Sequence, residues 1–346
     1  MARGPILITG GAGFLGAHLT AQFASAGVPV RLLDVTERPK WAGPEIQFVP
    51  GDVRDRQTVR AALLGVSGVV HAAFASPRQA RETIRSVNVE GTRTVCAAAA
   101  GQGIGRLVLV SSTIVARPPR SHRIFSDSPL ARLEAYRVSR IEAEAIAEAS
   151  GAQGMSVAVV RPKTFLGPSR VSAFGVLFEL IRQGRPVPLL GDGRNRYQLL
   201  DVRDLAEGIR LLAASDAGGV FAFGAREFGT VADDLQALFI HAQTGVRLRH
   251  VPPRLARVVL RGMELAGLVP LSEWHELSAR GEDSIVDTTR AEEELDWRAR
   301  RSNVQTLVDA YDWYVKAMAT TGRAARTHPV PFAHRALARL TWIIPR

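Results

Sequence analysis

A glycine-rich segment near the N-terminus is the part of the chain whose residue types and spacing most clearly predict chemistry. The segment reads TGGAGFLG, and its key glycines are Gly10, Gly13 and Gly16. The first glycine permits a tight turn, the second lets the backbone approach a phosphate, and the third lets a helix pack closely on a strand. Backbone N–H groups at the start of that helix, at Phe14 and Leu15, then face a pyrophosphate. The segment therefore predicts a dinucleotide-binding loop.

Acidic residues after the next two expected strands indicate which dinucleotide binds. Asp34 lies about 20 residues beyond the loop, where a carboxylate binds the ribose 2′-hydroxyl. The same carboxylate repels a 2′-phosphate, so NAD is favoured over NADP. Arg38 and Lys40 lie close by and keep NADP as the alternative. Asp52, followed by Val53, is predicted either to contact the adenine amino group or to form a plain turn.

Strand and helix signals alternate through the first half of the chain and supply the elements that must position these residues. Predicted strands fall at 5–9, 28–34, 46–50, 66–73, 106–111 and 155–161, and helical patterns at 17–26, 58–64, 83–101 and 134–150. This alternation predicts a parallel sheet covered on both faces, an α/β fold of the doubly wound Rossmann type.

The regular alternation ends after residue 161, which indicates a second unit. An apolar run at 199–204 is predicted to return to the sheet, and 220–225 is a further short strand. We expect a Rossmann domain at 1–168, to which 198–228 returns. A smaller, interleaved substrate-binding domain is expected at 169–197 and 229–318, and a basic tail at 319–346.

The composition of the chain excludes several classes of protein. With 346 residues, the chain is long enough for roughly two packed units, and its apolar fraction of 46% argues against disorder. The single cysteine, Cys96, provides for neither an internal disulfide nor a cysteine-based metal site, so no metal is predicted. No signal peptide and no apolar run of about 20 residues is found, and a cytoplasmic protein is expected. The net charge of +11 comes from scattered arginines, so nucleic acid is not an expected partner.

Ten short motifs follow one another in a fixed order along the chain. They are the glycine loop, Asp34, GDVRD at 51–55, HAA at 71–73, NVEGT at 88–92, SST at 111–113, Tyr136-x-x-x-Arg140, Arg161-Pro162 with Gly167-Pro168, LLDVRDLAEGI at 199–209, and ELDW at 294–297. Together they resemble the NAD-dependent epimerase/dehydratase family, the extended short-chain dehydrogenase/reductases, over about residues 4–318. The resemblance adds Ala72, Ala73, Asn88, Pro162 and Thr164 to the expected cofactor site.

The same resemblance implies a catalytic set and shows one departure from it. Tyr136 takes the place of the family's acid/base tyrosine, and Ser112 that of the hydroxyl group that shares its hydrogen bond, with Thr113 adjacent. A lysine usually stands four residues after the tyrosine, and here that residue is Arg140. Arginine keeps the charge, but it is planar and does not donate its proton. Three interpretations stay open: Arg140 substitutes electrostatically, other groups do the chemistry, or the protein binds a dinucleotide without turnover.

The substrate is expected to be a nucleotide sugar, acted on by hydride transfer at a carbinol carbon. Arg196, in a loop that resembles the sugar-nucleotide loop of the family, and Arg280 are candidates to hold a pyrophosphate. No Asp-Glu pair follows Ser112, which disfavours dehydration. The apolar stretch at 258–271 supports an alternative, a dehydrogenase or reductase of an apolar, hydroxysteroid-like alcohol. A homodimer is expected in either case.

The last segment, 323–346, lies beyond the family pattern. It carries four arginines before the final one and ends in LTWIIPR. A basic segment with Trp and Ile suits contact with a membrane surface, and packing on the domain or on a second subunit is the alternative.

Overall fold

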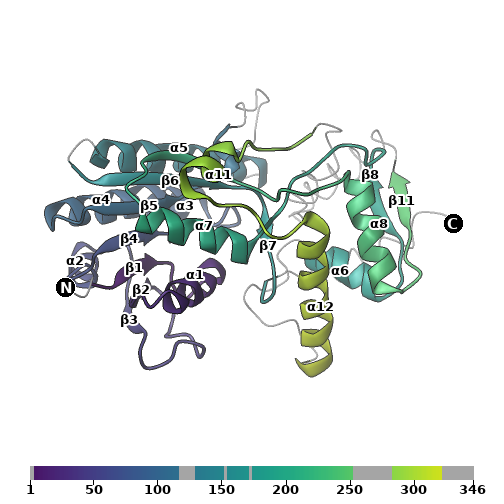
Figure 1. Cartoon of the computed structure of the whole chain (residues 1–346), viewed down its shortest axis with the longest axis horizontal. Helices are drawn as coiled ribbons and strands as arrows, with labels where there is room; N and C mark the ends of the chain where they lie inside the picture. The colour runs from purple at the N-terminus through teal and green to yellow at the C-terminus, as the bar shows by residue number, and fades with distance from the viewer. Residues whose placement is uncertain (1–3, 117–128, 152–153, 171–173, 252–282, 322–346) are drawn as a thin grey trace. The chain divides into compact units, whose positions relative to one another are not determined.

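The computed structural model describes residues 4–116, 129–151, 154–170, 174–251 and 283–321 (Figure 1). The chain forms two compact units that interleave along the sequence. The first comprises Met1–Lys163, Val202–Gly224 and Val286–Ala299, and the second Thr164–Asp201, Ala225–Ile285 and Arg300–Arg346.

The first unit is built on a seven-stranded parallel sheet. Its strands are β1 (Ile6–Thr9), β2 (Val30–Asp34), β3 (Gln47–Pro50), β4 (Gly68–His71), β5 (Arg106–Val110), β6 (Ser156–Pro162) and β10 (Gly219–Phe223). The strand order is β10-β6-β5-β4-β1-β2-β3. From β1 the chain runs outward to β3, then crosses back to place β4 on the other side of β1. The carboxyl ends of β1 and β4 are therefore the topological switch point of the sheet, where α/β proteins bind ligands.

The central strands are apolar because both faces of the sheet are covered. All residues of β1, β4 and β5 are buried. Ile8 pairs with Leu32 on β2 and with Val70 on β4, and all three side chains are fully buried. Such continuous apolar strands are typical of a doubly wound parallel sheet, and the predicted fold class is confirmed.

Helices cover the two faces of this sheet (Figure 1). On one face, Val59, Val95 and Ala147 share a core with Leu7 and Leu107 of the sheet. These three residues belong to α2 (Arg56–Ala62), α4 (Thr92–Gly101) and α5 (Pro129–Gly151), with α3 (Arg81–Arg85) against α5. The other face carries α1 (Phe14–Ser25), α7 (Val202–Ala214) and α11 (Thr289–Leu295), of which α7 packs on α1, α11 and the central strands.

Two predicted elements differ from the structure. The helix expected at 83–101 is divided into α3, a π-helical segment, η1 (Ser86–Gly91), and α4. The strand expected at 199–204 is wrong beyond residue 201. Only β9 (Leu200–Asp201) is extended, and it pairs with β7 (Phe165–Leu166) of the second unit instead of the seven-stranded sheet. From Val202 the buried apolar residues recur with helical spacing, and this periodicity outweighs the apolar run that precedes it.

Residues 286–299 belong to the first unit, although they fall within the segment expected to bind substrate. Trp297 explains this placement. Its indole Nε1 donates to the Asp204 carbonyl at 3.0 Å, and its ring meets that of Phe223 edge-on with centroids 4.7 Å apart. One buried aromatic residue therefore anchors the segment on α7 and β10.

The second unit has its own core. A parallel pair, β8 (Val187–Leu190) and β11 (Leu248–Val251), accompanies the helices α6 (Phe174–Arg182), α8 (Val231–Ala242) and α12 (Asn303–Thr321). The three helices contribute Phe178, Leu238 and Tyr311, among others, to one buried cluster. Thr230 begins α8 with a reciprocal capping box to Asp233.

Most of the predicted tail, 322–346, lies outside the described residues. Of the helices in the described ranges, none combines the length and the apolar character that crossing a bilayer requires.

Candidate active site

The glycine loop joins β1 to α1 at the switch point. Gly10 has a φ of +68°, which only glycine adopts freely, and a Cβ there would lie 2.8 Å from the Ala72 carbonyl oxygen. A Cβ on Gly16 would lie 2.3 Å from the Gly11 carbonyl oxygen, so Gly16 serves the packing of the helix on the loop rather than on the strand. Gly13, the N-cap of α1, offers no capping side chain. The first turn of α1, which includes Phe14 and Leu15, therefore presents backbone N–H groups without a side-chain cap.

Asp34 ends β2 beside this loop. One carboxylate oxygen accepts a hydrogen bond from the Ala12 N–H at 3.0 Å, and the other accepts two from Thr36, also at 3.0 Å. The carboxylate is thus oriented by these groups and remains partly exposed. This fixed position agrees with a carboxylate that recognises a ribose hydroxyl.

Asp52 and Val53 follow β3 and differ in their surroundings. The Asp52 carboxylate is held by the Arg54 side chain, with Nη2 2.5 Å from Oδ2, and by the Arg54 N–H at 2.9 Å. This arginine holds the pKa of Asp52 below its usual range. Val53 is buried against Gly91. The segment is therefore a stabilised turn, and its contact with adenine stays a prediction.

A buried histidine connects the ends of β1 and β4. The His71 Nδ1 atom lies 2.7 Å from the Thr9 hydroxyl, and Nε2 lies 3.0 Å from the Thr92 hydroxyl. Thr92 donates its proton to the Asn88 carbonyl, so Nε2 must carry the hydrogen of the ring. Burial, with a smaller effect of the Arg140 charge, lowers the pKa of His71 to about 3. His71 is a neutral connector between strands and not a base.

Asn88 supports the loop that follows β4. Its amide oxygen accepts from the Ala75 N–H at 2.7 Å, and its Nδ2 donates to the Ser139 hydroxyl on α5 at 2.9 Å. Ser139 in turn donates to the Tyr136 carbonyl at 2.8 Å. Asn88 lies in the π-helical segment and joins the β4 loop, which holds Ala72 and Ala73, to the helix that carries Tyr136.

Tyr136, Arg140 and Glu144 form one stripe along α5, because residues four apart lie on one face of a helix. Tyr136 is half-buried, and the other two side chains are buried. The Arg140 guanidinium carbon lies 3.5 Å from the centroid of the Phe74 ring and 5.3 Å from that of Tyr136.

Arg140 is only partly satisfied. Only 4% of the residue is exposed, and its Nη2 atom donates to the Ser111 carbonyl at 3.0 Å. Its Nε and Nη1 atoms have no hydrogen-bond acceptor among the described residues. Burial lowers the pKa of the guanidinium, while Tyr136 and Glu144 oppose this shift. Buried donors without acceptors are costly, and a ligand that accepted hydrogen bonds from these two atoms would relieve that cost.

Glu144 balances the charge at the buried end of the stripe. The carboxylate accepts a hydrogen bond from the Ser111 hydroxyl and pairs with Arg161 on β6 at 2.6 Å and 3.1 Å. Glu144 raises the pKa of Arg161. The pair fixes α5 against the ends of β5 and β6.

The remaining predicted catalytic residues follow β5. Ser112 accepts a hydrogen bond from the Ile114 N–H at 3.3 Å, and Thr113 begins a short 3-10 helix, η2 (Thr113–Ala116), that packs beside α5. In the described residues no hydrogen bond joins Ser112 to Tyr136. Pro162 ends β6, beside Phe223 of β10.

Two predicted residues belong to the second unit, and a third is not described. In the second unit, the Thr164 hydroxyl lies 2.7 Å from that of Tyr197, and Arg196 forms an exposed ion pair with Asp283 at 2.7 Å. Arg280, like the apolar stretch at 258–271, lies outside the described residues.

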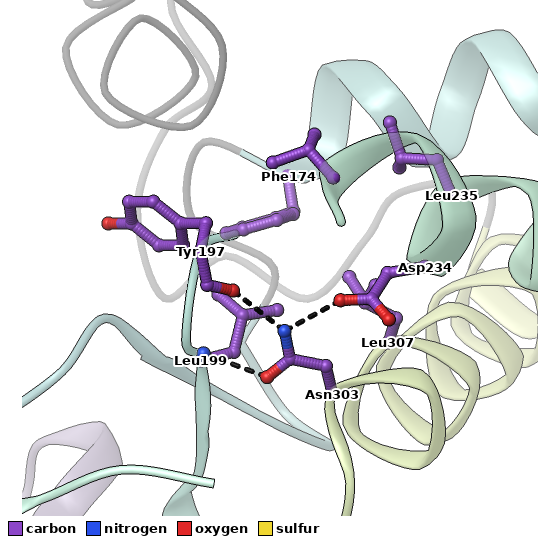
Figure 2. A pocket seen from close by; sticks show the side chains of 8 residues that line it. Phe174, Tyr197, Leu199, Asp234, Leu235, Asn303 and Leu307 are labelled. Atoms are coloured by element: carbon purple, nitrogen blue, oxygen red, sulfur yellow. Dashed lines mark hydrogen bonds between the residues drawn. The ribbon is translucent and has the colours of Figure 1, made fainter. Parts of the chain in front are cut away.

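A small pocket in the second unit is structural (Figure 2). The Asn303 amide donates to the Tyr197 carbonyl and to Asp234, each at 2.7 Å, and accepts from the Leu199 N–H at 2.8 Å. The cavity of about 20 Å³ has room for a single water molecule. Burial raises the pKa of Asp234. We call Asn303 and Asp234, with the two backbone groups, the Asn303 brace.

The first unit fits a dinucleotide on two observations. The glycine loop has an N-terminal helix turn without a side-chain cap at the switch point, and Arg140 has two buried donor nitrogen atoms without acceptors among the described residues. The residues that would hold the cofactor are those of the glycine loop, Asp34 and Arg140.

These features define a doubly wound Rossmann fold with a glycine loop at its switch point. The sequence profile of the NAD dependent epimerase/dehydratase family matches residues 6–224. The chain belongs to this family.

Individual relatives add detail. The chain is 32% identical over 343 residues to uncharacterized protein y4nG of Sinorhizobium fredii (strain NBRC 101917 / NGR234), a match that covers 98% of this chain and 86% of the relative. It is 29% identical over 233 residues to the decarboxylating sterol-4-alpha-carboxylate 3-dehydrogenase of Mus musculus, covering 66% and 64% of the two chains. The UDP-glucose 4-epimerase of Thermus thermophilus, solved with NAD, gives a TM-score of 0.67 at 22% identity over 90% of this chain and 99% of that one. This last likeness shows the fold alone.

Sequence reasoning did not single out Phe74, Glu144 or Ser139 as site residues. Glu144 had a usable signal, since it stands four residues after Arg140 on a predicted helix. Phe74 had none beyond its place directly after the HAA motif.

Proposed function

We propose that this protein is an NAD-dependent oxidoreductase or epimerase that acts at a carbinol carbon. The observation that carries the proposal is the pair on α5, in which Arg140 has two buried donor nitrogen atoms without acceptors in the described chain and lies one helical turn from Tyr136. A buried cation with free donors beside a tyrosine is suited to bind a ribose and to favour the ionised tyrosine.

The roles follow from the chemistry of the side chains. NAD, when bound, supplies the nicotinamide carbon that accepts a hydride from the carbinol carbon. Tyr136 takes the hydroxyl proton as the carbinol becomes a carbonyl, and returns it in the reverse direction. Arg140 stabilises the tyrosinate and donates to the cofactor ribose through Nε and Nη1. Ser112, with Thr113 beside it, donates to the substrate oxygen. Because an arginine keeps its proton, the proton leaves Tyr136 without passing through residue 140.

A nucleotide sugar is the first proposed substrate class. Arg194 and Arg196 lie in one loop of the second unit, with side chains 88% and 54% exposed. The ion pair of Arg196 with Asp283 is also exposed, and such pairs contribute about 1 kcal/mol or less. A pyrophosphate, which accepts bidentate hydrogen bonds from arginine, competes well for such a side chain.

An apolar secondary alcohol is the second proposed substrate class. The observation that favours it is the likeness to a mammalian sterol dehydrogenase at 29% identity. NAD is the proposed cofactor in both cases, since Asp34 is oriented to meet a ribose hydroxyl and repels a phosphate.

The test is purification, identification of any nucleotide released on denaturation, and assay with UDP-sugars and 3-hydroxysterols under NAD and NADP. Turnover of a UDP-sugar with retained NAD supports the epimerase, and reduction of added NAD by a sterol supports the dehydrogenase. Binding of NAD without turnover of either class would refute catalysis on these substrates. Turnover that persists in the Tyr136→Phe variant would refute the role of Tyr136.

A further inference from the structure

An arginine at residue 140 differs from a lysine in that its guanidinium can stack on an aromatic ring, and Phe74 provides such a ring. A guanidinium is planar and weakly hydrated, so it stacks on aromatic faces, whereas an ammonium is a compact and strongly hydrated charge. The Phe74 ring centroid lies 3.5 Å from the guanidinium carbon, which is stacking distance.

The stacking restricts the guanidinium in one direction and a hydrogen bond restricts it in another. Phe74 covers a face, and the Ser111 carbonyl accepts from Nη2 at 3.0 Å. The groups left over are Nε and Nη1, the two that have no acceptor in the described chain. The contact with Phe74 thus leaves the remaining donors available to a ligand.

Phe74 is itself held in place by the buried network at the switch point. Its ring lies 5.0 Å from the His71 ring, centroid to centroid. The next residue, Ala75, is fixed by Asn88 through a hydrogen bond of 2.7 Å. The ring contact restricts the Phe74 side chain and the hydrogen bond restricts the adjoining backbone, so Phe74 provides a fixed platform.

We propose that Phe74 is a positioning residue, which acts on the cofactor through Arg140. This inference rests on the proposed function, in which Arg140 binds the ribose and favours the ionised form of Tyr136. Phe74 and Arg140 work as a pair: an arginine at residue 140 requires the aromatic ring, and a lysine there does not.

The test is a double-mutant cycle on the full chain, with Phe74→Leu and Phe74→Tyr placed in both the wild-type and the Arg140→Lys backgrounds. NAD affinity is measured by isothermal titration calorimetry. A desolvated cation–π contact leads us to expect Phe74→Leu to weaken NAD binding by about tenfold or more. Phe74→Tyr keeps the ring and retains wild-type binding. In the Arg140→Lys background, Phe74→Leu changes NAD affinity less than about threefold.

Equal losses in both backgrounds would overturn the proposal, because Phe74 would then only pack the core. A Phe74→Tyr variant that folds and loses as much affinity as Phe74→Leu would also overturn it. Absence of NAD binding by the wild type would refute both this proposal and the proposed function. NAD binding without turnover would refute the function alone, since the affinity cycle still decides the role of Phe74.

Discussion

The protein contains two buried polar clusters that differ in how completely they are satisfied. In the Asn303 brace of the second unit, each amide hydrogen-bonding atom that the structure describes meets a carbonyl, a carboxylate or a backbone N–H. In the stripe on α5 of the first unit, Arg140 leaves Nε and Nη1 without acceptors in the described residues. A closed cluster stabilises a fold, while an open one carries an energetic cost that a ligand can relieve. The comparison supports a structural role for the brace and the proposed role of the stripe in binding and chemistry.

The largest expected effect is a loss of kcat that occurs when the stripe is changed and not when the second unit is changed. We expect Tyr136→Phe to reduce kcat by about 10³-fold, because the loss of a general acid/base typically costs about 10² to 10⁴. Stability and NAD affinity should change little, since only a half-buried hydroxyl is removed. The matched control is Tyr314→Phe in the second unit, which loses a 2.7 Å hydrogen bond to Glu179. Steady-state kinetics of the control should match the wild type; equal losses of kcat in both variants would remove the distinction.

The brace should dominate stability. Replacing Asn303 with leucine leaves the Asp234 Oδ2 atom and the Leu199 N–H buried without their partners, while Asp234 Oδ1 keeps the hydrogen bond from the Gly229 N–H. We expect the free energy of unfolding to fall by about 3 kcal/mol in urea denaturation. Gln305→Leu, on the exposed side of the same helix, removes only the acceptor of the Ser302 N–H and should cost under about 1 kcal/mol. Similar losses for the two variants would mean that the brace is not a stabilising cluster.

Because His71 is buried in the first unit, we expect the stability of the protein to depend on pH. The pKa of His71 falls from 6.5 to about 3 on folding, so the unfolded chain binds the proton between these values. Its contribution to stability is therefore complete above pH 6.5 and is lost as the pH falls, by up to about 1.4 kcal/mol per pH unit. His71→Leu, although less stable throughout, should show a flatter slope than the wild type in denaturation between about pH 4 and 6.5. Parallel curves for the two proteins would contradict a buried neutral histidine.

The smallest expected effect is the most informative about the open cluster. Without cofactor, Arg140→Met removes the stacking on Phe74 and one hydrogen bond, but it also removes two unsatisfied buried donors. Since unsatisfied donors cost about 1–3 kcal/mol each, the terms nearly cancel, and we expect the apo protein to change in stability by about 1 kcal/mol or less. Thermal denaturation without nucleotide measures this. A loss as large as that of Asn303→Leu would show that Arg140 is already satisfied.

Much of the first unit was predictable from sequence because local signals agree there. The strands are continuous apolar runs, and the glycines mark the turn between β1 and α1. The π-helical segment was not predictable, because the Asn88 amide that accompanies it bonds to Ala75, 13 residues away. The place of residues 286–299 depends on the packing of Trp297 against Phe223, which no local pattern encodes.

The candidate site shows the same limit. The spacing of Tyr136 and Arg140 was sufficient to place both on one helix face. The unsatisfied donors of Arg140 were not visible, because they depend on which distant residues, Phe74 among them, the fold brings against the guanidinium. Sequence identifies which groups are present, and tertiary packing decides which of their hydrogen bonds remain open.

The central claim is that the open donors of Arg140 hold the nicotinamide half of the cofactor. Calorimetric titration of NAD and of ADP into the wild type and into Arg140→Met tests it most directly, because ADP lacks the nicotinamide ribose. We expect Arg140→Met to weaken NAD binding by roughly ten- to a hundredfold, as for hydrogen bonds from a charged group, and to leave ADP binding within about twofold. Equal effects on NAD and ADP, or no effect on either, would contradict the claim.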